Sequence, residues 1–134
     1  MKIEISITTE LLENFSERVP ANDALVGAHA SFVGIVRGEE NGRAIEAIEY
    51  EAYQPMAERE MEKILRELEK EFPCDHVSVI HRTGKIPVGE AAIRVSTFSK
   101  HRAEAFGLLT NFMDRLKEDV PIWKVDKIGP VTRS

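Results

Sequence analysis

The chain has 134 residues, of which 43% are hydrophobic and 31% charged, and its formal net charge is -5 at pH 7. This length suits one domain, and the composition is too apolar for a disordered chain. The sequence contains no apolar run of about 18 residues that could span a membrane, and its acidic isoelectric point near 5.4 argues against a general nucleic-acid binder. The first residues carry acids and no signal-peptide core. We therefore expect one cytoplasmic domain, in which a local basic pocket would suit a small anion.

The first third of the chain predicts strands and one short helix. Residues 2–7 alternate between apolar and polar side chains, as a strand does. Residues 8–19 combine a threonine cap with an apolar stripe, so a short helix is expected there. A long apolar strand follows over 24–37, and its Gly27 and Gly34 indicate a bulge or a close backbone approach.

The rest of the chain alternates between strands and helices. An Asn-Gly turn leads into a strand over 44–53, which we expect to pair with the strand before it. The further predicted elements are an amphipathic helix over 54–72, strands over 75–82 and 91–99, a helix from Lys100 to about Val120, and a short strand over 122–128. Residues 127–134 are expected to loosen into a tail. The prediction is one α+β domain over 1–134, with three helices and a largely antiparallel sheet.

The last predicted helix starts with Ser99-Lys-His-Arg102, so its N-terminal turn carries cations. Ser99 is a suitable N-cap, and the first turn of a helix favours acids because of its partial positive charge. A bound phosphate or carboxylate, held by free N–H groups and Arg102, would explain these cations. The alternative is a solvated helix start whose cations pair with surface acids.

The far end of the same helix holds two lysines, Lys117 and Lys124, on either side of Pro121. Lys117 follows Met113 by one helical turn, and Lys124 follows the single tryptophan, Trp123. A lysine half-buried against Met and Trp loses solvation and becomes a usable acid, base or nucleophile. The alternative is a lysine whose stem is buried and whose amine stays in water.

Other candidate residues favour structural interpretations. The single cysteine, Cys74, excludes an internal disulfide, and the four histidines show no ligand spacing, so we expect no metal and no cofactor. Arg37 ends a strand and can face water. His81 and Arg82 enter a turn, whose loop they can hydrogen-bond.

Several motifs in order resemble the MoaE family, the large catalytic subunits of molybdopterin synthase. The resemblance runs from about Gly27 to Asp126. The motifs are Phe32-Val-Gly-Ile-Val-Arg37, Tyr50-Glu-Ala-Tyr-Gln-Pro-Met-Ala57, His81-Arg-Thr-Gly84 with Gly89-Glu90, Ser99-Lys-His-Arg102 with Ala105-Phe106, and Lys117 followed by Pro121-Ile-Trp-Lys124. The resemblance implies an α/β hammerhead fold.

The resemblance also implies a reaction and its partners. A small ubiquitin-like subunit, MoaD, carries a thiocarboxylate on its C-terminal Gly-Gly tail and inserts this tail into the large subunit. Its sulfur is transferred twice to cyclic pyranopterin monophosphate, which gives the dithiolene of molybdopterin. The large subunit forms a central homodimer within a heterotetramer. No nucleic acid and no membrane is involved.

By the same resemblance, Lys117 and Lys124 are the catalytic residues. Lys117 would lie near the thiocarboxylate, and Lys124 would assist proton transfer or stabilise developing charge. The residues implied in substrate binding are Ile35, Val36, Arg37, His101, Arg102, Lys117, Lys124, Val125 and Asp126.

Two departures from the family pattern leave an alternative open. The chain has Asp126 where the family usually has Glu, and it continues as KIGPVTRS where the family has Asp-Gly and a later Trp. A non-catalytic relative could keep the pterin pocket and the small subunit without turnover. A module that binds nucleic acid or phosphopeptides through the same basic pocket is a third possibility, and it would show strong salt dependence.

Overall fold

The computed structural model describes residues 1–16 and 24–129, except for the side chain of Asp126. Its strands are β1 (Lys2–Thr8), β2 (Ala28–Ile35), β3 (Glu39–Glu40), β4 (Arg43–Ala44), β5 (Ala47–Ala52), β6 (His76–Arg82), β7 (Gly84–Pro87), β8 (Ala91–Ser99) and β9 (Ile122–Ile128). Its helices are α1 (Gln54–Glu69), α2 (Arg102–Asp119) and the short 3₁₀ helix η1 (Leu12–Asn14). The fold is a mixed α+β domain with mostly antiparallel pairing.

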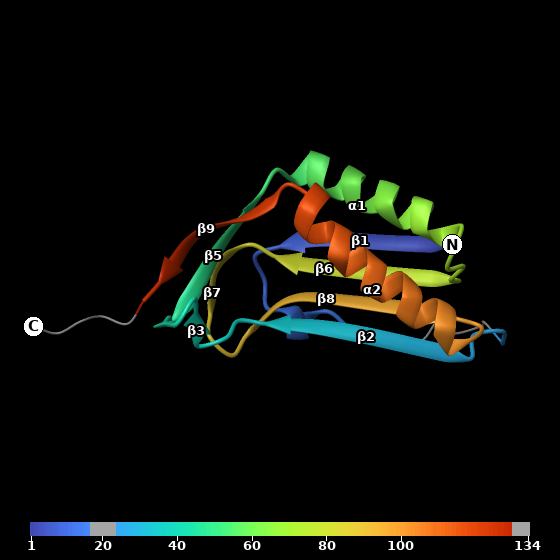
Figure 1. Cartoon of the computed structure of the whole chain (residues 1–134), viewed down its shortest axis with the longest axis horizontal. Helices are drawn as coiled ribbons and strands as arrows, with labels where there is room; N and C mark the ends of the chain where they lie inside the picture. Colours follow the sequence, from blue (N-terminus) through green and yellow to red (C-terminus); the bar gives the residue numbers. More distant parts are fainter. Residues whose placement is uncertain (17–23, 130–134) are drawn as a thin grey trace, which may run out of the picture.

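The larger sheet has the strand order β1-β6-β8-β2. β1 runs parallel to β6, and the other neighbours are antiparallel. α1 and α2 lie side by side over one face of this sheet (Figure 1). Alternate residues of the central strands point at the helices, so Val77, Val79 and Val95 are fully buried against Leu108 and Phe112. This interface forms the main hydrophobic core.

The amphipathic helix α1 forms as its periodicity predicts. Its buried residues are Ala57, Met61, Ile64 and Leu65, which recur at helical spacing. Pro55 lies in the first turn, where its missing N–H leaves no intrahelical bond unmade. The helix ends at Glu69, three residues before the predicted end.

A second, smaller sheet has the order β7-β5-β9 and carries its own core. The predicted pairing of the strand over 44–53 with the strand before it is wrong. β5 pairs with β7 and β9, whereas β2 pairs with β8. The Asn-Gly turn instead joins the two-residue strands β3 and β4, with positive φ angles of 53° at Asn41 and 76° at Gly42. The chain thus leaves the large sheet through a small hairpin and enters the second sheet.

The predicted helix over 8–19 is also wrong, as far as the structure describes it. Only the 3₁₀ helix η1 forms, and residues 17–19 lie outside the described residues. Thr8 belongs to β1, and its hydroxyl accepts a hydrogen bond from the Glu10 N–H in a local turn instead of capping a helix. Residues 1–16 and 24–129 therefore contain two α-helices, where three were predicted.

The boundaries of α2 and β9 differ from the predictions. α2 begins at Arg102, because His101 is still extended and the Ser99 hydroxyl donates to the His101 carbonyl instead of capping N–H groups. β9 continues through Ile128, so the first two residues of the predicted tail belong to a strand. Residues 130–134 lie outside the described residues.

The two glycines of the predicted strand over 24–37 make the close approaches expected of them, although β2 itself covers only Ala28–Ile35. A Cβ atom at Gly27 would lie 2.6 Å from the Lys100 carbonyl oxygen, and one at Gly34 would lie 2.8 Å from a methyl carbon of Ile93. The register with β8 also shifts after Gly34, which is the expected bulge.

Candidate functional site

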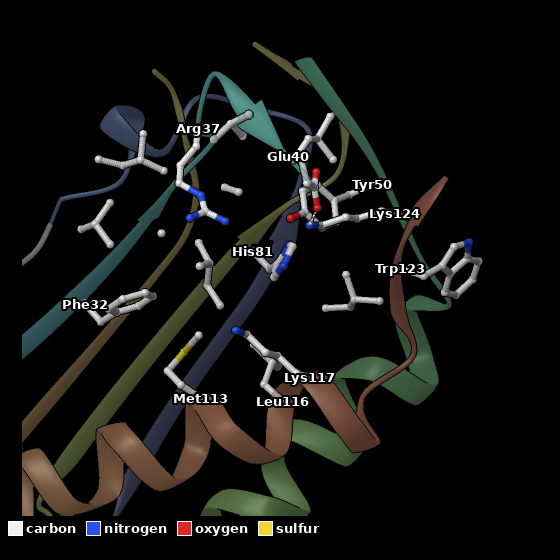
Figure 2. A pocket seen from close by; sticks show the side chains of 18 of the residues that line it. Phe32, Arg37, Glu40, Tyr50, His81, Met113, Leu116, Lys117, Trp123 and Lys124 are labelled. Atoms are coloured by element: carbon white, nitrogen blue, oxygen red, sulfur yellow. Dashed lines mark hydrogen bonds and ion pairs between the residues drawn. The ribbon is translucent and has the colours of Figure 1, made fainter. Parts of the chain in front are cut away.

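A cavity of about 690 Å³ lies where the two sheets meet the C-terminal part of α2. The end of β2, the hairpin strand β3, the strands β5 and β9 and the last turns of α2 all line it (Figure 2). Its apolar lining includes Phe32, Ile93, Met113 and Leu116. Because these elements lie far apart between Phe32 and Lys124 in the sequence, the cavity forms only when both sheets and α2 are assembled. A cavity of this size suits a drug-sized small molecule.

Lys117 projects into this cavity from α2 (Figure 2). Its neighbours Met113 and Leu116 line the same wall, so the apolar stripe of α2 ends at the lysine. Lys117 is exposed within the open cavity, which agrees with the alternative in which the amine stays in water and not with a half-buried lysine. None of the described side chains forms an ion pair with its amine.

Lys124 enters the cavity from β9 and, unlike Lys117, is held by a carboxylate. Its Nζ donates to Glu40 Oε1 at 2.5 Å, across 84 positions of sequence. Lys127 lies 3.8 Å from the same oxygen. The hydrogen bond from Lys124 is the main reason why the pKa of Glu40 lies below its ordinary value. The cavity thus contains one unpaired lysine and one paired lysine.

Arg37 reaches the cavity from a backbone that is firmly fixed. Val36 is buried, its N–H donates to the Glu90 carbonyl, and its own carbonyl accepts from the Gly89 N–H. Ile35 and Val36 line the cavity beside Arg37, whose guanidinium points inward (Figure 2). The strand-end arginine therefore belongs to the cavity wall, and it adds a third cation to the two lysines.

His81 and Tyr50 form the inner wall between the lysines (Figure 2). The His81 Nδ1 lies 2.8 Å from the Arg82 carbonyl oxygen. Because a carbonyl only accepts, Nδ1 carries the proton in the neutral ring. Burial lowers the pKa of His81 and raises the pKa of Tyr50, so both side chains are kept neutral. The two rings meet edge to face, with centroids 5.4 Å apart.

The structure does not bring His101 and Arg102 into this cavity. Both are exposed at the opposite end of α2, beside the end of β8 (Figure 1). Fifteen residues of helix separate Arg102 from Lys117, which is roughly 22 Å at 1.5 Å per residue. Of the three cations predicted in the first turn, only Arg102 lies in the helix.

The last two predicted binding residues lie in β9. Val125 is about half-exposed and is not part of the cavity lining. Asp126 has its backbone opposite Glu49 in the second sheet, and its side chain lies outside the described residues.

Several cavity residues were missed by the sequence reasoning. Glu40 was assigned to the Asn-Gly turn, and Tyr50 to a regular alternating strand. His81 was expected to bond the loop, which it does, and Arg82 likewise binds Glu90 at 2.7 Å. The family motif His81-Arg-Thr-Gly84 includes His81, but no sequence signal placed its ring in the cavity wall.

Cys74 takes no part in the cavity. It is buried between α2 and the sheet, and its thiol donates weakly to the Glu104 carbonyl. Burial, with a smaller effect of Asp75, raises the pKa of the Cys74 thiol to about 12. A thiol of this kind is a poor nucleophile at neutral pH. The described residues contain no group of three or more His, Cys, Asp or Glu side chains placed to hold a metal ion, and none of the described helices is long and apolar enough to cross a membrane.

The fold and the cavity define a small mixed α+β protein with a pocket lined by Arg37, Lys117 and Lys124. Residues 5–119 match the family model described as "MoaE protein". The chain belongs to the MoaE protein family.

Individual relatives agree with this assignment. The chain is 43% identical over 100 residues to the molybdopterin synthase catalytic subunit of Homo sapiens, which covers 75% of this chain and 53% of that protein. It is 36% identical over 126 residues to the protein of the same name from Dictyostelium discoideum, and the match covers 92% of this chain and 79% of that protein. The solved structure of molybdopterin synthase from Staphylococcus aureus superposes with a TM-score of 0.80 at 34% identity, over 95% of this chain and 90% of that one. The chain spans about half the length of the human relative.

Proposed function

We propose that the chain is the catalytic subunit of a molybdopterin synthase. It transfers sulfur from the C-terminal thiocarboxylate of a small ubiquitin-like subunit to cyclic pyranopterin monophosphate in molybdenum cofactor biosynthesis. The observation that carries the proposal is the convergence of Arg37, Lys117 and Lys124 on one cavity from three separate elements. The family and its relatives supply the reaction, and the proposal includes the hammerhead arrangement and the cytoplasmic location implied by the resemblance.

The cavity offers distinct environments for the parts of this substrate. Phe32, Ile93 and Met113 form an apolar wall that a ring system can contact. Arg37 and the lysines supply positive charge, which attracts a phosphate and a thiocarboxylate. Neutral Tyr50 and His81 line the space between them, where they can hydrogen-bond without adding charge.

The two lysines are proposed to divide the chemistry. The amine of Lys117 has no carboxylate partner among the described side chains, so it is available to contact the incoming thiocarboxylate. Lys124 is held near Glu40 and supplies a fixed positive charge or a proton as a carbon–sulfur bond forms. Sulfur comes from the partner, so the buried Cys74 has no role in the transfer.

A second copy of the chain is proposed to complete the site. His101 and Arg102 are too far from Lys117 along α2 to share its cavity within one chain, yet both are exposed and free to face a neighbour. In a homodimer, one protomer can present these cations to the phosphate bound in its partner's cavity. The heterotetramer then contains two such composite sites and two small subunits.

Mixing two inactive variants tests the composite site. Lys117→Ala and Arg102→Ala are co-expressed with different affinity tags, and the hybrid dimers are assayed. Each hybrid dimer has one intact site of two, so the isolated hybrids should show about half of wild-type activity. Hybrids without activity would show that Arg102 serves the cavity of its own chain.

Reconstitution tests the proposed function itself. The purified chain is mixed with a thiocarboxylated small subunit and cyclic pyranopterin monophosphate, and molybdopterin is measured as its fluorescent oxidised derivative. Wild type should form product, Lys117→Ala should not, and Lys63→Ala, which removes an exposed lysine of α1, should match wild type. Binding of pterin and partner without product would instead identify a non-catalytic relative.

A further inference from the structure

We propose that Glu40 is a positioning residue for Lys124, and that its carboxylate holds the Lys124 ammonium group in the orientation needed for sulfur transfer. The role rests on the proposed function of the cavity. It concerns a residue of the short hairpin β3–β4, which neither the sequence pattern nor the family motifs single out.

The contact is short, and its acid is the less exposed partner. Glu40 Oε1 accepts from Lys124 Nζ at 2.5 Å, and Lys127 Nζ lies 3.8 Å from the same atom. The Glu40 side chain is 15% exposed, whereas both lysine side chains are 41% exposed. A charge-assisted bond of this length is stronger than a neutral one. The carboxylate thus forms a fixed anchor to which the more mobile lysine is attached.

The charges around Glu40 keep it ionised while an anionic substrate is bound. Lys124, Lys127 and Arg37 all lower the pKa of this carboxyl group, and Lys124 has the largest effect. The neutral Tyr50 ring faces the same group. Because three cations surround one acid, the cluster keeps a net positive charge and can still attract an anion.

The backbone of β9 is shaped to turn Lys124 toward Glu40. Asp126 pairs with Glu49, and Lys124 pairs with the next residue, Tyr50, so Val125 is an extra residue in β9. Such a bulge re-aims the neighbouring side chains and is frequent beside active sites. The bulge and the carboxylate therefore act on the same lysine from two different segments.

Lys117 provides the internal contrast. It lines the same cavity, but no described carboxylate holds its amine. If an ion pair were needed only to stabilise the fold around the cavity, a carboxylate could pair with either lysine. Since only Lys124 is paired, the cavity has a fixed positive charge at Lys124 and a free amine at Lys117.

The remaining oxygen of Glu40 supports a role in the site. Oε2 is buried and has no hydrogen-bond partner among the described residues. A buried acceptor without a donor is costly, so a structural ion pair would be expected to satisfy both oxygens. Oε2 is available to a donor, such as a ring N–H group of the bound molecule or a water molecule.

The first test compares activity in four single variants and one double variant. Glu40→Gln keeps the shape and removes the charge, Glu40→Asp shortens the acid, and Glu46→Gln makes the same charge change at an exposed position outside the cavity lining. We expect Glu40→Gln to lower kcat by roughly tenfold to a hundredfold with little change in KM, Glu40→Asp to recover part of the loss, and Glu46→Gln to match wild type. In a Lys124→Ala background, Glu40→Gln should have no further effect. An equal loss with and without Lys124 would overturn the proposal.

The second test requires no activity. Each protein is treated briefly with an amine-acetylating reagent, and modification of Lys124 and Lys117 is quantified by peptide mass spectrometry. Glu40→Gln should raise the rate at Lys124 severalfold, because the amine then loses its charge-assisted bond to Glu40, and should leave Lys117 unchanged. Equal rates at Lys124 in Glu40→Gln and Glu46→Gln would overturn the proposal. Inactive wild type would refute the proposed function alone, since this result would still decide whether Glu40 holds Lys124.

Discussion

Gly107 lies at the closest approach between α2 and the turn that follows α1. A Cβ atom added there would lie 2.3 Å from Phe72 Cδ1 and 2.5 Å from Cε1. Gly107 is an interior position of an 18-residue helix, where helix propensity alone favours alanine by about 0.5–1 kcal/mol. In Gly107→Ala, the gain in helix propensity therefore opposes the loss in packing. The geometry around Phe72 decides whether the free energy of unfolding falls or rises.

Packing should prevail by a small margin. Two carbon atoms in contact lie about 3.5–4 Å apart, so the Phe72 ring must retreat by more than about 1 Å. Overpacking of this kind costs about 1–3 kcal/mol, and the partly buried position of Phe72 allows the ring to move outward, which favours the lower part of that range. After the propensity gain is subtracted, Gly107→Ala should destabilise the domain by about 1 kcal/mol, or lower Tm by about 4 °C.

A double-mutant cycle separates the two effects. Stability is measured by urea unfolding in wild type, Gly107→Ala, Phe72→Ala and the double variant. Without the Phe72 ring the clash is absent, so Gly107→Ala should now stabilise by about 0.5–1 kcal/mol. A substitution that destabilises equally in both backgrounds would refute the steric argument, and one that stabilises wild type would show that the ring moves at no cost.

Three further predictions follow from buried groups. Cys74, with its pKa raised to about 12, should react with a thiol reagent far more slowly in the native protein than in urea, and Cys74→Ser should keep the proposed sulfur-transfer activity. His81 has a lowered pKa, so below about pH 6.5 the unfolded state binds its proton first and stability falls. His81→Gln should therefore show a smaller loss of unfolding free energy between pH 7.5 and 5.5 than wild type, whereas a steeper loss would contradict the burial argument. Ile86 is fully buried in the second core, so Ile86→Ala should cost about 2–5 kcal/mol in urea unfolding, and a cost under 1 kcal/mol would mean that this core is not closely packed.

The spacing of hydrophobic residues correctly predicted the helices and strands that pack with one face against the main core. The spacing of Ala57, Met61, Ile64 and Leu65 identifies the buried face of α1, and the alternation of Val77 and Val79 identifies the buried face of β6. In these segments, local pattern and tertiary environment agree. The family motifs also located Arg37 and both lysines, which the structure brings to one cavity.

Pairing partners were beyond the reach of the sequence pattern. β2 is apolar enough to pair with any neighbour, and its partner β8 lies more than 50 residues further on. The hairpin after β2 resembled a link between adjacent strands, yet it connects two different sheets. Glu40 looked like a turn residue because its partner, Lys124, is 84 positions away. His101 and Arg102 lie far from the cavity because fifteen residues of helix separate Arg102 from Lys117, a separation that the predicted helix from Lys100 to about Val120 already implied.

The hairpin β3–β4 adds no side chain to either hydrophobic core, yet its Glu40 contacts one of the two lysines of the cavity. Substitutions in this segment should therefore cost little packing energy, and a substitution of Glu40 acts directly on the electrostatics of Lys124. Over evolutionary time, such a segment can vary in sequence while the scaffold stays constant. If Glu40 positions Lys124 as proposed, turnover is adjustable at one position of a surface hairpin that lies outside both hydrophobic cores.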